Sequence, residues 1–221
     1  MKLRLHNYWR SSASHRVRIA LGLKGLAWEY VVVNILEGKQ HDSAYTANNA
    51  MAQVPTLEII EDDGRTHHLT QSLPIIEYLD ERFPEPPLFP TGPRALEDRA
   101  RVRAIAEMVN SGIQPLQNLS TTNALGKVGG DVKTWVQGFI TRGLEAIERE
   151  LSRSAGAGRY CVGDTPTLAD CVLVPQIHSA RRFAVDLAAF PRISAIGAAC
   201  EELPAFSSSA PDRQPDAVRS P

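Results

Sequence analysis

The sequence lacks an excess of charge of either sign and lacks a long apolar run near its start. Lys and Arg together number 24 and Asp and Glu number 25, so the formal net charge of the 221 residues is -1. This balance disfavours a nucleic-acid-binding protein, which normally carries a basic excess. The absence of an apolar run disfavours a secretory signal or a membrane span, so we expect a cytoplasmic protein without a membrane partner.

Cysteine is scarce, and no metal-ligand pattern is present. The three cysteines, Cys161, Cys171 and Cys200, are odd in number and form no CxxC pair. This pattern predicts reduced thiols in the core of a cytosolic protein. His67 and His68 are adjacent, but none of the histidines has metal-ligand spacing. We therefore expect no bound metal.

Residues 1–83 switch between the two-residue period of strands and the period of helices. The pattern predicts strands over 2–7, 28–33, 56–60 and 65–69, and helices over 17–25, 42–48 and 72–83. An Asp-Asp-Gly sequence at 62–64 predicts a hairpin between the last two strands. Ser72 has the position of a hydroxyl N-cap. The order β-α-β-(α)-β-β-α indicates a small α/β domain.

Five prolines and a glycine within residues 84–93 predict a linker. The helical period dominates after it, with apolar stripes over 102–116 and 132–151 and further helices from near Thr167 and Ile193. From Ser207 onward the residues are small, polar and rich in proline, so we expect loose packing there. The predicted organisation is an α/β domain, a linker and an all-helical domain, over residues 1–83, 84–93 and 94–221.

The serine-rich turn at residues 10–16 joins a buried strand to the start of a helix. Free backbone N–H groups and the helix dipole favour an anion at such a position. A thiolate is such an anion, since helix N-termini lower the pKa of thiols. Ser11, Ser12 and Ser14 add hydroxyl donors to this turn. A serine-rich helix cap without further role is the structural alternative.

Two further features suit parts of a peptide ligand. Pro55 at the start of a strand can be cis and leaves Val54 extended, so that the amide and carbonyl of Val54 can pair with a peptide. Gln71 and Ser72 lie at another helix N-terminus, which suits a carboxylate. Taken singly, each feature also has a structural explanation, as a strand edge or a helix cap. Together with the serines they indicate one anionic ligand of tripeptide size.

The sequence resembles the zeta class of the glutathione transferases over almost its whole length. The string from Ser11 to Leu21 looks like the zeta-class signature, and the order of elements around Val54-Pro55 resembles the family's thioredoxin-like domain. Further matches lie at residues 71–72, 75–79, 112–118, 160–164, 167–170 and 182–187. The resemblance implies the glutathione transferase fold, with an α/β thioredoxin-like domain followed by an all-α domain. It also implies glutathione as the cofactor and a homodimer as the assembly.

The resemblance assigns the first set of site residues to the α/β domain. Ser11 would hydrogen-bond the glutathione sulfur, and Ser12 would assist it. Val54 would pair with the cysteinyl backbone. The glycyl end would be approached by Gln40 and the γ-glutamyl end held by Gln71 and Ser72.

A second set follows from the same resemblance. Gln114, Asn118, Leu119 and Ser120 match residues of the helical domain that close over the glutathione site. Arg10 and Arg182 match arginines that receive substrate carboxylates, a task that suits the planar guanidinium.

The resemblance implies a glutathione-dependent cis–trans isomerase that converts maleylacetoacetate to fumarylacetoacetate in tyrosine and phenylalanine catabolism. A thiolate adds to the conjugated cis double bond, the bond rotates, and elimination of the thiolate leaves the trans isomer. Ala13 stands in place of the cysteine of the eukaryotic signature, and His15 in place of a common tryptophan; neither change removes the serines. Residues 119–121 lack the arginines that some maleylpyruvate isomerases carry there, which favours maleylacetoacetate.

Four alternatives accompany this hypothesis. The chain could be a maleylpyruvate isomerase of gentisate breakdown, or a general glutathione transferase that conjugates electrophiles. A non-catalytic transferase-like module is disfavoured by the intact serines and by Gln71. A thiol–disulfide oxidoreductase would need a CxxC motif where the chain has residues 11–14.

Thr167 and Asp170 form a predicted capping box, which we interpret as purely structural.

Overall fold

A computed structural model describes residues 1–153 and 158–218 of the chain. It divides into two compact units. The first contains Met1–Pro86 together with the C-terminal segment from Pro204, and the second contains Pro87–Leu203. The division between Pro86 and Pro87 falls inside the predicted linker. The C-terminal segment, predicted in the helical domain, belongs instead to the first unit.

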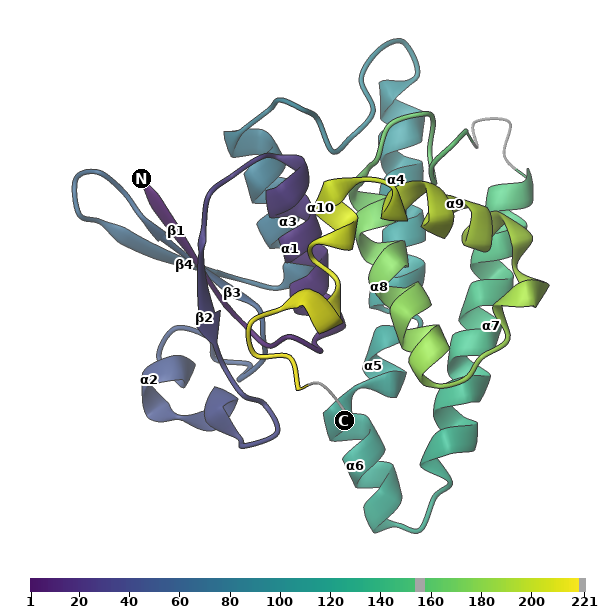
Figure 1. Cartoon of the computed structure of the whole chain (residues 1–221), viewed down its shortest axis with the longest axis horizontal. Coiled ribbons are helices and arrows are strands. Elements are labelled where there is room, and N and C mark those ends of the chain that lie inside the picture. Colours follow the sequence, from purple (N-terminus) through teal and green to yellow (C-terminus); the bar gives the residue numbers. More distant parts are fainter. Residues whose placement is uncertain (154–157, 219–221) are drawn as a thin grey trace. The chain divides into compact units, whose positions relative to one another are not determined.

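The first unit is built on a four-stranded sheet with the order β2-β1-β3-β4 (Figure 1). The strands are β1 Lys2–Asn7, β2 Glu29–Val32, β3 Thr56–Ile60 and β4 Thr66–Thr70. β1 pairs parallel with β2 and antiparallel with β3, and β3 pairs antiparallel with β4. The predicted strands and the hairpin around Gly64 are therefore confirmed.

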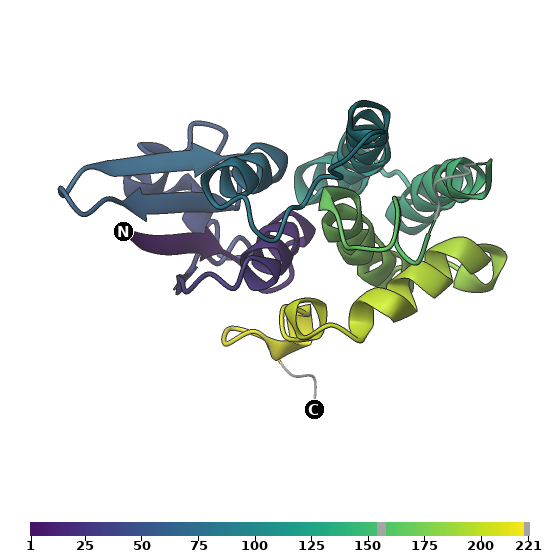
Figure 2. The same cartoon turned by 90° about the horizontal axis from the view of Figure 1, so that it is seen from above.

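Helices α1 (Ser12–Leu23) and α3 (Ser72–Arg82) pack against each other and cover one face of the sheet (Figure 2). Leu3 and Leu5 alternate along β1 and are buried on this face. A short 3₁₀ turn, η1 (Lys39–His41), and α2 (Ser43–Thr46) lie over the opposite face. There, the ring of Tyr45 lies 6.2 Å from the ring of His6.

The start of α3 corrects one prediction. Ser72 is the first residue of the helix rather than its N-cap, and the N-cap residue is Gln71, which makes no side-chain capping bond. The hydroxyl of Ser72 accepts a hydrogen bond from Nη1 of Arg16 at 3.1 Å instead. A local capping rule does not anticipate this partner, because Arg16 lies 56 residues earlier in the chain.

The C-terminal segment corrects a second prediction. Residues from Ser207 onward were predicted to pack loosely, but α10 (Pro204–Ser207) packs against α1 and Phe206 is buried (Figure 1). The two helices approach closely because Gly22 has no side chain. A Cβ atom there would lie 3.1 Å from the Cα of Ala205. Beyond α10, the 3₁₀ turn η3 (Pro211–Arg213) continues the ordered segment.

The second unit is helical. Its elements are α4 Ala95–Asn110, α5 Gln114–Gln117, α6 Leu119–Lys127, α7 Val132–Arg153, α8 Leu168–Arg182, η2 Leu187–Ala189 and α9 Pro191–Glu201. Helix α8 is buried along most of its length and packs against α4, α7 and α9. The helix α6 was not predicted, since none of its residues is buried and no apolar stripe marks it. Within residues 1–153 and 158–218, no helix combines the length and apolar character that a membrane crossing requires.

The capping box at the start of α8 is confirmed. The carboxylate of Asp170 accepts hydrogen bonds from the amide and the hydroxyl of Thr167, at 2.8 and 2.9 Å, and from the amide of Cys161 at 2.9 Å. Burial raises the pKa of this carboxyl group, and the hydrogen bonds partly offset that rise. These three hydrogen bonds fix the start of α8, which agrees with the structural role that the sequence predicts for Thr167 and Asp170.

Candidate functional site

The serine turn lies at the N-terminus of α1. Ser11 is the N-cap residue, and its Oγ accepts a hydrogen bond from the amide of Ser14 at 3.1 Å. Its own hydroxyl hydrogen is not used in that bond, so Ser11 can still donate to a ligand. Ser12 is the first residue of the helix, where backbone N–H groups are without helical partners. The turn therefore offers hydroxyl and amide donors to an anion, as the sequence predicts.

The start of α3 supplies a second group of candidate residues in the same unit. Gln71 has φ 68° and ψ 123°, a backbone conformation that side-chain-bearing residues rarely adopt. Such residues cost on the order of 1–3 kcal/mol and cluster at ligand sites. Ser72 is buried and its Oγ accepts from Arg16 of α1. This hydrogen bond joins the N-terminal half of α1 to the first turn of α3.

The loop before β3 presents unpaired backbone. The Val54–Pro55 bond is cis, and no other described residue bonds the amide or carbonyl of Val54. The preceding carbonyl, of Gln53, is held by the hydroxyl of Tyr45 at 2.5 Å and by the amide nitrogen of Asn49 at 2.6 Å. Val54 is half-buried, and its backbone amide and carbonyl remain available for pairing on a loop that two side chains fix in place.

Gln40 lies in η1, at the edge of the same unit. Its Oε1 is buried and has no hydrogen-bond partner among the described residues. A buried amide oxygen without a partner costs free energy unless a ligand or water satisfies it. This unpartnered oxygen makes Gln40 a candidate ligand-binding residue.

The predicted residues of the second unit form their own group. Gln117 donates to Oε1 of Gln114 at 3.2 Å and exchanges hydrogen bonds with the buried Gln176. Asn118 is the N-cap residue of α6, and its Oδ1 accepts from the amide of Leu119 at 2.9 Å. Leu119 and Ser120, at the start of α6, are exposed.

The two candidate arginines differ in exposure. Arg10 is half-buried, and its Cζ lies 5.6 Å from the centroid of the Trp9 ring. Arg182 is exposed at the end of α8, with its Cζ 5.1 Å from the centroid of the Phe183 ring. Both guanidinium groups lie near an aromatic ring, and a planar guanidinium is a group suited to binding carboxylates.

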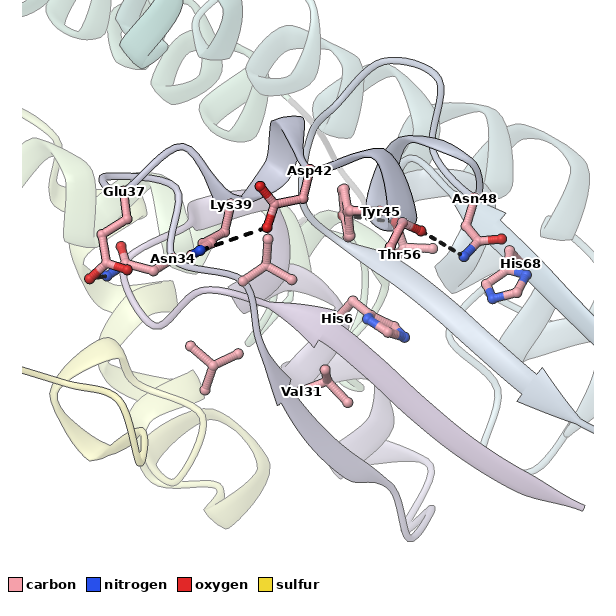
Figure 3. Close-up of a pocket in the computed structure, with 13 residues that line it drawn as sticks. His6, Val31, Asn34, Glu37, Lys39, Asp42, Tyr45, Asn48, Thr56 and His68 are labelled. Carbon is pink, nitrogen blue, oxygen red and sulfur yellow. Dashed lines mark hydrogen bonds and ion pairs between the residues drawn. The ribbon is translucent and has the colours of Figure 1, made fainter.

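A cavity of about 460 Å³ lies on the sheet face away from α1 (Figure 3). It is lined by His6, Val31, Val32, Val33, Asn34, Glu37, Lys39, Asp42, Ala44, Tyr45, Asn48, Thr56 and His68. His6 faces this side because side chains alternate along β1 and Asn7 faces Arg18 of α1. None of the predicted site residues lines the cavity, although Lys39 and Thr56 are close in sequence to Gln40 and Pro55.

An ion pair stands beside this cavity. Nε2 of His6 and Oε2 of Glu58 lie 2.8 Å apart, and Arg4 lies within 3.4 Å of the same carboxylate. Burial alone would raise the pKa of Glu58, but the hydrogen bond with His6 and the nearby positive charges outweigh it and lower the pKa. The carboxylate is therefore charged at neutral pH.

No cysteine of the chain is placed for thiol chemistry. Cys161, Cys171 and Cys200 are free and buried. Burial raises the pKa of the Cys161 and Cys200 thiols, which disfavours the reactive thiolate. Any thiolate used in a reaction must therefore come from a ligand. Over the described ranges, no three histidine, cysteine or carboxylate side chains gather to hold a metal ion.

Comparison with known proteins identifies the family. Residues 5–87 match the family model "Glutathione S-transferase, N-terminal domain" and residues 136–196 match "Glutathione S-transferase, C-terminal domain". With these matches and the full-length relatives described next, the chain belongs to the zeta class of the glutathione S-transferase family.

Three relatives illustrate the likeness. The chain is 46% identical over 214 residues to a probable maleylacetoacetate isomerase of Drosophila melanogaster, covering 96% of this chain and 89% of the relative. It is 44% identical over 220 residues to a maleylpyruvate isomerase of a Ralstonia species, covering 98% and 100%. The maleylacetoacetate isomerase of Anaeromyxobacter dehalogenans, solved with bound glutathione, is 51% identical with a TM-score of 0.88, covering 98% of each chain. A further crystal structure of that protein contains dicarboxyethyl glutathione and citrate.

Sequence reasoning missed two buried arginines. Arg16 and Arg18 are 1% and 2% exposed, although arginine in a helix is usually solvated. Arg16 reaches the first turn of α3, and Arg18 reaches the C-terminal segment. The signal in the sequence is their position: Arg18 lies within the apolar stretch from Val17 to Leu21, and Arg16 directly precedes it.

Proposed function

We propose that this chain is a glutathione-dependent cis–trans isomerase that converts maleylacetoacetate to fumarylacetoacetate. The observation that carries the proposal is the N-terminus of α1, where the Ser11 hydroxyl accepts from the amide of Ser14 and keeps its own hydrogen to donate. The buried cysteines leave the protein without a thiolate of its own. Relatives with this activity in their names, over nearly the full length, support the choice of reaction.

The residues of the first unit fit glutathione. Val54 has a free backbone amide and carbonyl for the cysteinyl residue of the ligand. The buried Oε1 of Gln40 lacks a partner among the described residues, and rotation of the amide group can turn Nε2 towards a glycyl carboxylate. Gln71 and Ser72, at the start of α3, suit the γ-glutamyl end. When bound, glutathione supplies a thiolate nucleophile that adds reversibly to the double bond.

The chain itself has three tasks in this reaction. Ser11, assisted by Ser12, donates a hydrogen bond to the sulfur and favours its ionised form. Arg10 and Arg182 bind the substrate carboxylates and orient the double bond. Gln114, Asn118, Leu119 and Ser120 of the second unit contribute to the binding of glutathione.

Maleylpyruvate is the second candidate substrate. The Ralstonia relative of 44% identity is named a maleylpyruvate isomerase, and both substrates are cis-unsaturated diacids. The absence of arginine at residues 119–121 favours maleylacetoacetate. General conjugation of electrophiles is a third activity that the same thiolate supports.

We further propose a cytoplasmic homodimer that serves tyrosine and phenylalanine catabolism. Three free, buried thiols suit a reducing compartment, and the dimer follows from the family. Light scattering of the purified protein tests the assembly, with the mass of two chains as the expected result.

The substrate assignment is tested by steady-state kinetics with both diacids at saturating glutathione. We expect a higher kcat/KM for maleylacetoacetate than for maleylpyruvate. A higher value for maleylpyruvate would transfer the proposal to that substrate. No turnover of either diacid, with conjugation of an uncharged electrophile intact, would leave a general transferase.

A further inference from the structure

The C-terminal segment is bonded to the turn that leads into α1. Asp216 accepts a hydrogen bond from the amide of Trp9 at 3.1 Å through one carboxylate oxygen. Its other oxygen accepts from the hydroxyl of Tyr30, on β2, at 2.5 Å. All three residues belong to the first unit. A residue 207 positions away thus fixes a backbone amide two residues before Ser11.

Arg18 fixes the same turn from the opposite side. Its guanidinium donates to the carbonyl of Trp9 at 3.0 Å, to the carbonyl of Tyr8 at 3.4 Å and to Oδ1 of Asn7 at 3.0 Å. Its Nε donates to the carbonyl of Ser209, in the C-terminal segment, at 3.2 Å. One buried side chain therefore ties the end of β1, the turn and the C-terminal segment together.

The turn ends at the candidate donor itself. The amide of Ser11 donates to the carbonyl of Tyr8 at 3.0 Å, and Arg18 bonds that same carbonyl. Hydrogen bonds thus hold the backbone from Tyr8 to Ser11 at four polar groups, the carbonyls of Tyr8 and Trp9 and the amides of Trp9 and Ser11. Small shifts of this path move the Ser11 hydroxyl relative to the helix N-terminus. Positioning of reacting groups within an ångström commonly changes rates by a large factor.

We propose that Arg18 and Asp216 are positioning residues for Ser11, and that Asp216 is the residue through which the C-terminal segment acts on the catalytic turn. This inference rests on the proposed role of Ser11 towards the glutathione sulfur. Arg18 and Asp216 contact the turn and do not need to touch the ligand. The segment from Pro204 to Asp216 then holds the catalytic turn in place through the carboxylate of Asp216.

Arg18 and Tyr30 keep their protonation states around neutral pH, so the hydrogen bonds of this cluster do not depend on a titration there. Burial lowers the pKa of Arg18 to about 10, so its guanidinium stays charged at neutral pH. Burial and the hydrogen bond to Asp216 raise the pKa of Tyr30, so its hydroxyl stays protonated and keeps donating. The charges of Arg18 and Asp216 compensate each other inside the unit, since an isolated buried charge is costly.

The test compares three full-length variants in the presence of glutathione. Asp216→Ala removes the hydrogen bonds to the Trp9 amide and to the Tyr30 hydroxyl. Tyr30→Phe removes only the second of these bonds. Asp212→Ala is the matched control, because Asp212 lies on the same segment, is exposed, and takes no part in the hydrogen bonds that join Asp216 to Trp9 and Tyr30. The readouts are the pKa of the bound glutathione thiol, from the ultraviolet absorbance of the thiolate, and kcat and KM for the isomerisation.

We expect Asp216→Ala to raise the pKa of the bound thiol and to lower kcat about tenfold, because a displaced Ser11 would lose its hydrogen bond to the charged sulfur. KM for the diacid should change little. Tyr30→Phe should shift both quantities in the same direction by less, and it decides the matter alone if Asp216→Ala does not fold. A thiol pKa and kcat equal to those of Asp212→Ala, even with a lower melting temperature, would overturn the proposal. A parent protein that does not lower the thiol pKa would instead contradict the role of Ser11.

Discussion

Nη1 of Arg16 donates to Oγ of Ser72 over 3.1 Å, which connects the two helices whose N-termini carry the candidate glutathione residues. Arg16 lies on α1 at the end of the serine-rich stretch, and Ser72 is the first residue of α3, directly after the strained Gln71. The hydroxyl of Ser72 accepts in this bond and so keeps its hydrogen for a ligand carboxylate. The bond gives Ser72 a fixed orientation and couples it to α1.

Gln71 is the first residue to test, because its backbone strain points to a ligand role. We expect Gln71→Ala to weaken glutathione binding, while Gln71→Gly weakens binding and also relieves strain at φ 68°. The glycine variant should therefore unfold at a higher temperature than the alanine variant. Calorimetric titration with glutathione and thermal unfolding measure the two effects. Equal affinity in the parent and both variants would remove Gln71 from the site.

Ser11 and Ser12 are predicted to differ in their effect on the reaction. Ser11→Ala should lower kcat and leave the affinity for glutathione largely intact, because a donor to the thiolate chiefly affects reactivity. A hydrogen bond to a charged group contributes about 1.5–3 kcal/mol, so we expect a loss of about tenfold or more. Ser12→Ala measured alongside should cost less. A larger loss with Ser12→Ala would reverse the assignment of the two serines.

Arg10 and Arg182 are predicted to act on the diacid alone. Arg10→Ala and Arg182→Ala should each raise KM for maleylacetoacetate, because each variant removes a charged hydrogen-bonding partner of one substrate carboxylate. Conjugation of an uncharged electrophile should stay nearly unaffected. Arg181→Ala is the matched control, because Arg181 is exposed on the same helix and pairs with Glu201 at 2.8 Å. Equal losses in both assays would assign the two arginines to the fold or to glutathione binding.

The ion pair beside the cavity predicts an acid limit of stability. The pKa of Glu58 is lowered in the folded protein from the ordinary value of 4.5. A lowered carboxyl pKa contributes stability that is complete above the unfolded pKa and is lost as the pH falls through the folded one. Glu58→Gln should therefore flatten the fall of the melting temperature below pH 4.5. Glu61→Gln, on the neighbouring turn, should follow the parent; a parent-like profile for Glu58→Gln would refute the linkage.

The cysteines are predicted to be spectators. Cys161→Ser, Cys171→Ser and Cys200→Ser should each keep kcat, at some cost in stability because the hydroxyl is buried in an apolar environment. Turnover and thermal unfolding of the three variants provide the measurement. A folded variant that binds glutathione but has lost turnover would mean that a protein thiol takes part.

Much of the fold could be predicted because local patterns carry it. The alternation along β1, the Asp-Asp-Gly hairpin and the apolar stripe of α7 each depend on residues close together in sequence. The position of Ser11 at the N-terminus of α1 follows from local sequence as well, because a strand pattern changes to a helix pattern there. The roles of the individual site residues towards glutathione and substrate stay predictions.

The remainder could not be predicted because its partners are distant in the sequence. Arg18 bonds Ser209 across 191 positions, and Asp216 bonds Trp9 across 207. These contacts order a segment whose small and polar composition predicts loose packing. The prediction that Ser72 caps α3 was wrong for the same reason, since its hydroxyl bonds Arg16, which is distant in the sequence, and not a neighbouring backbone amide.

The most direct test of the account replaces only the thiol of the ligand. Isomerisation of maleylacetoacetate is followed with glutathione, with S-methylglutathione and without either, using the same enzyme preparation. Competition between the two ligands first establishes that S-methylglutathione occupies the site. We expect rapid formation of fumarylacetoacetate with glutathione and none with S-methylglutathione, because the methylated sulfur cannot become a thiolate. Equal rates with the two ligands, or turnover without any ligand, would contradict it.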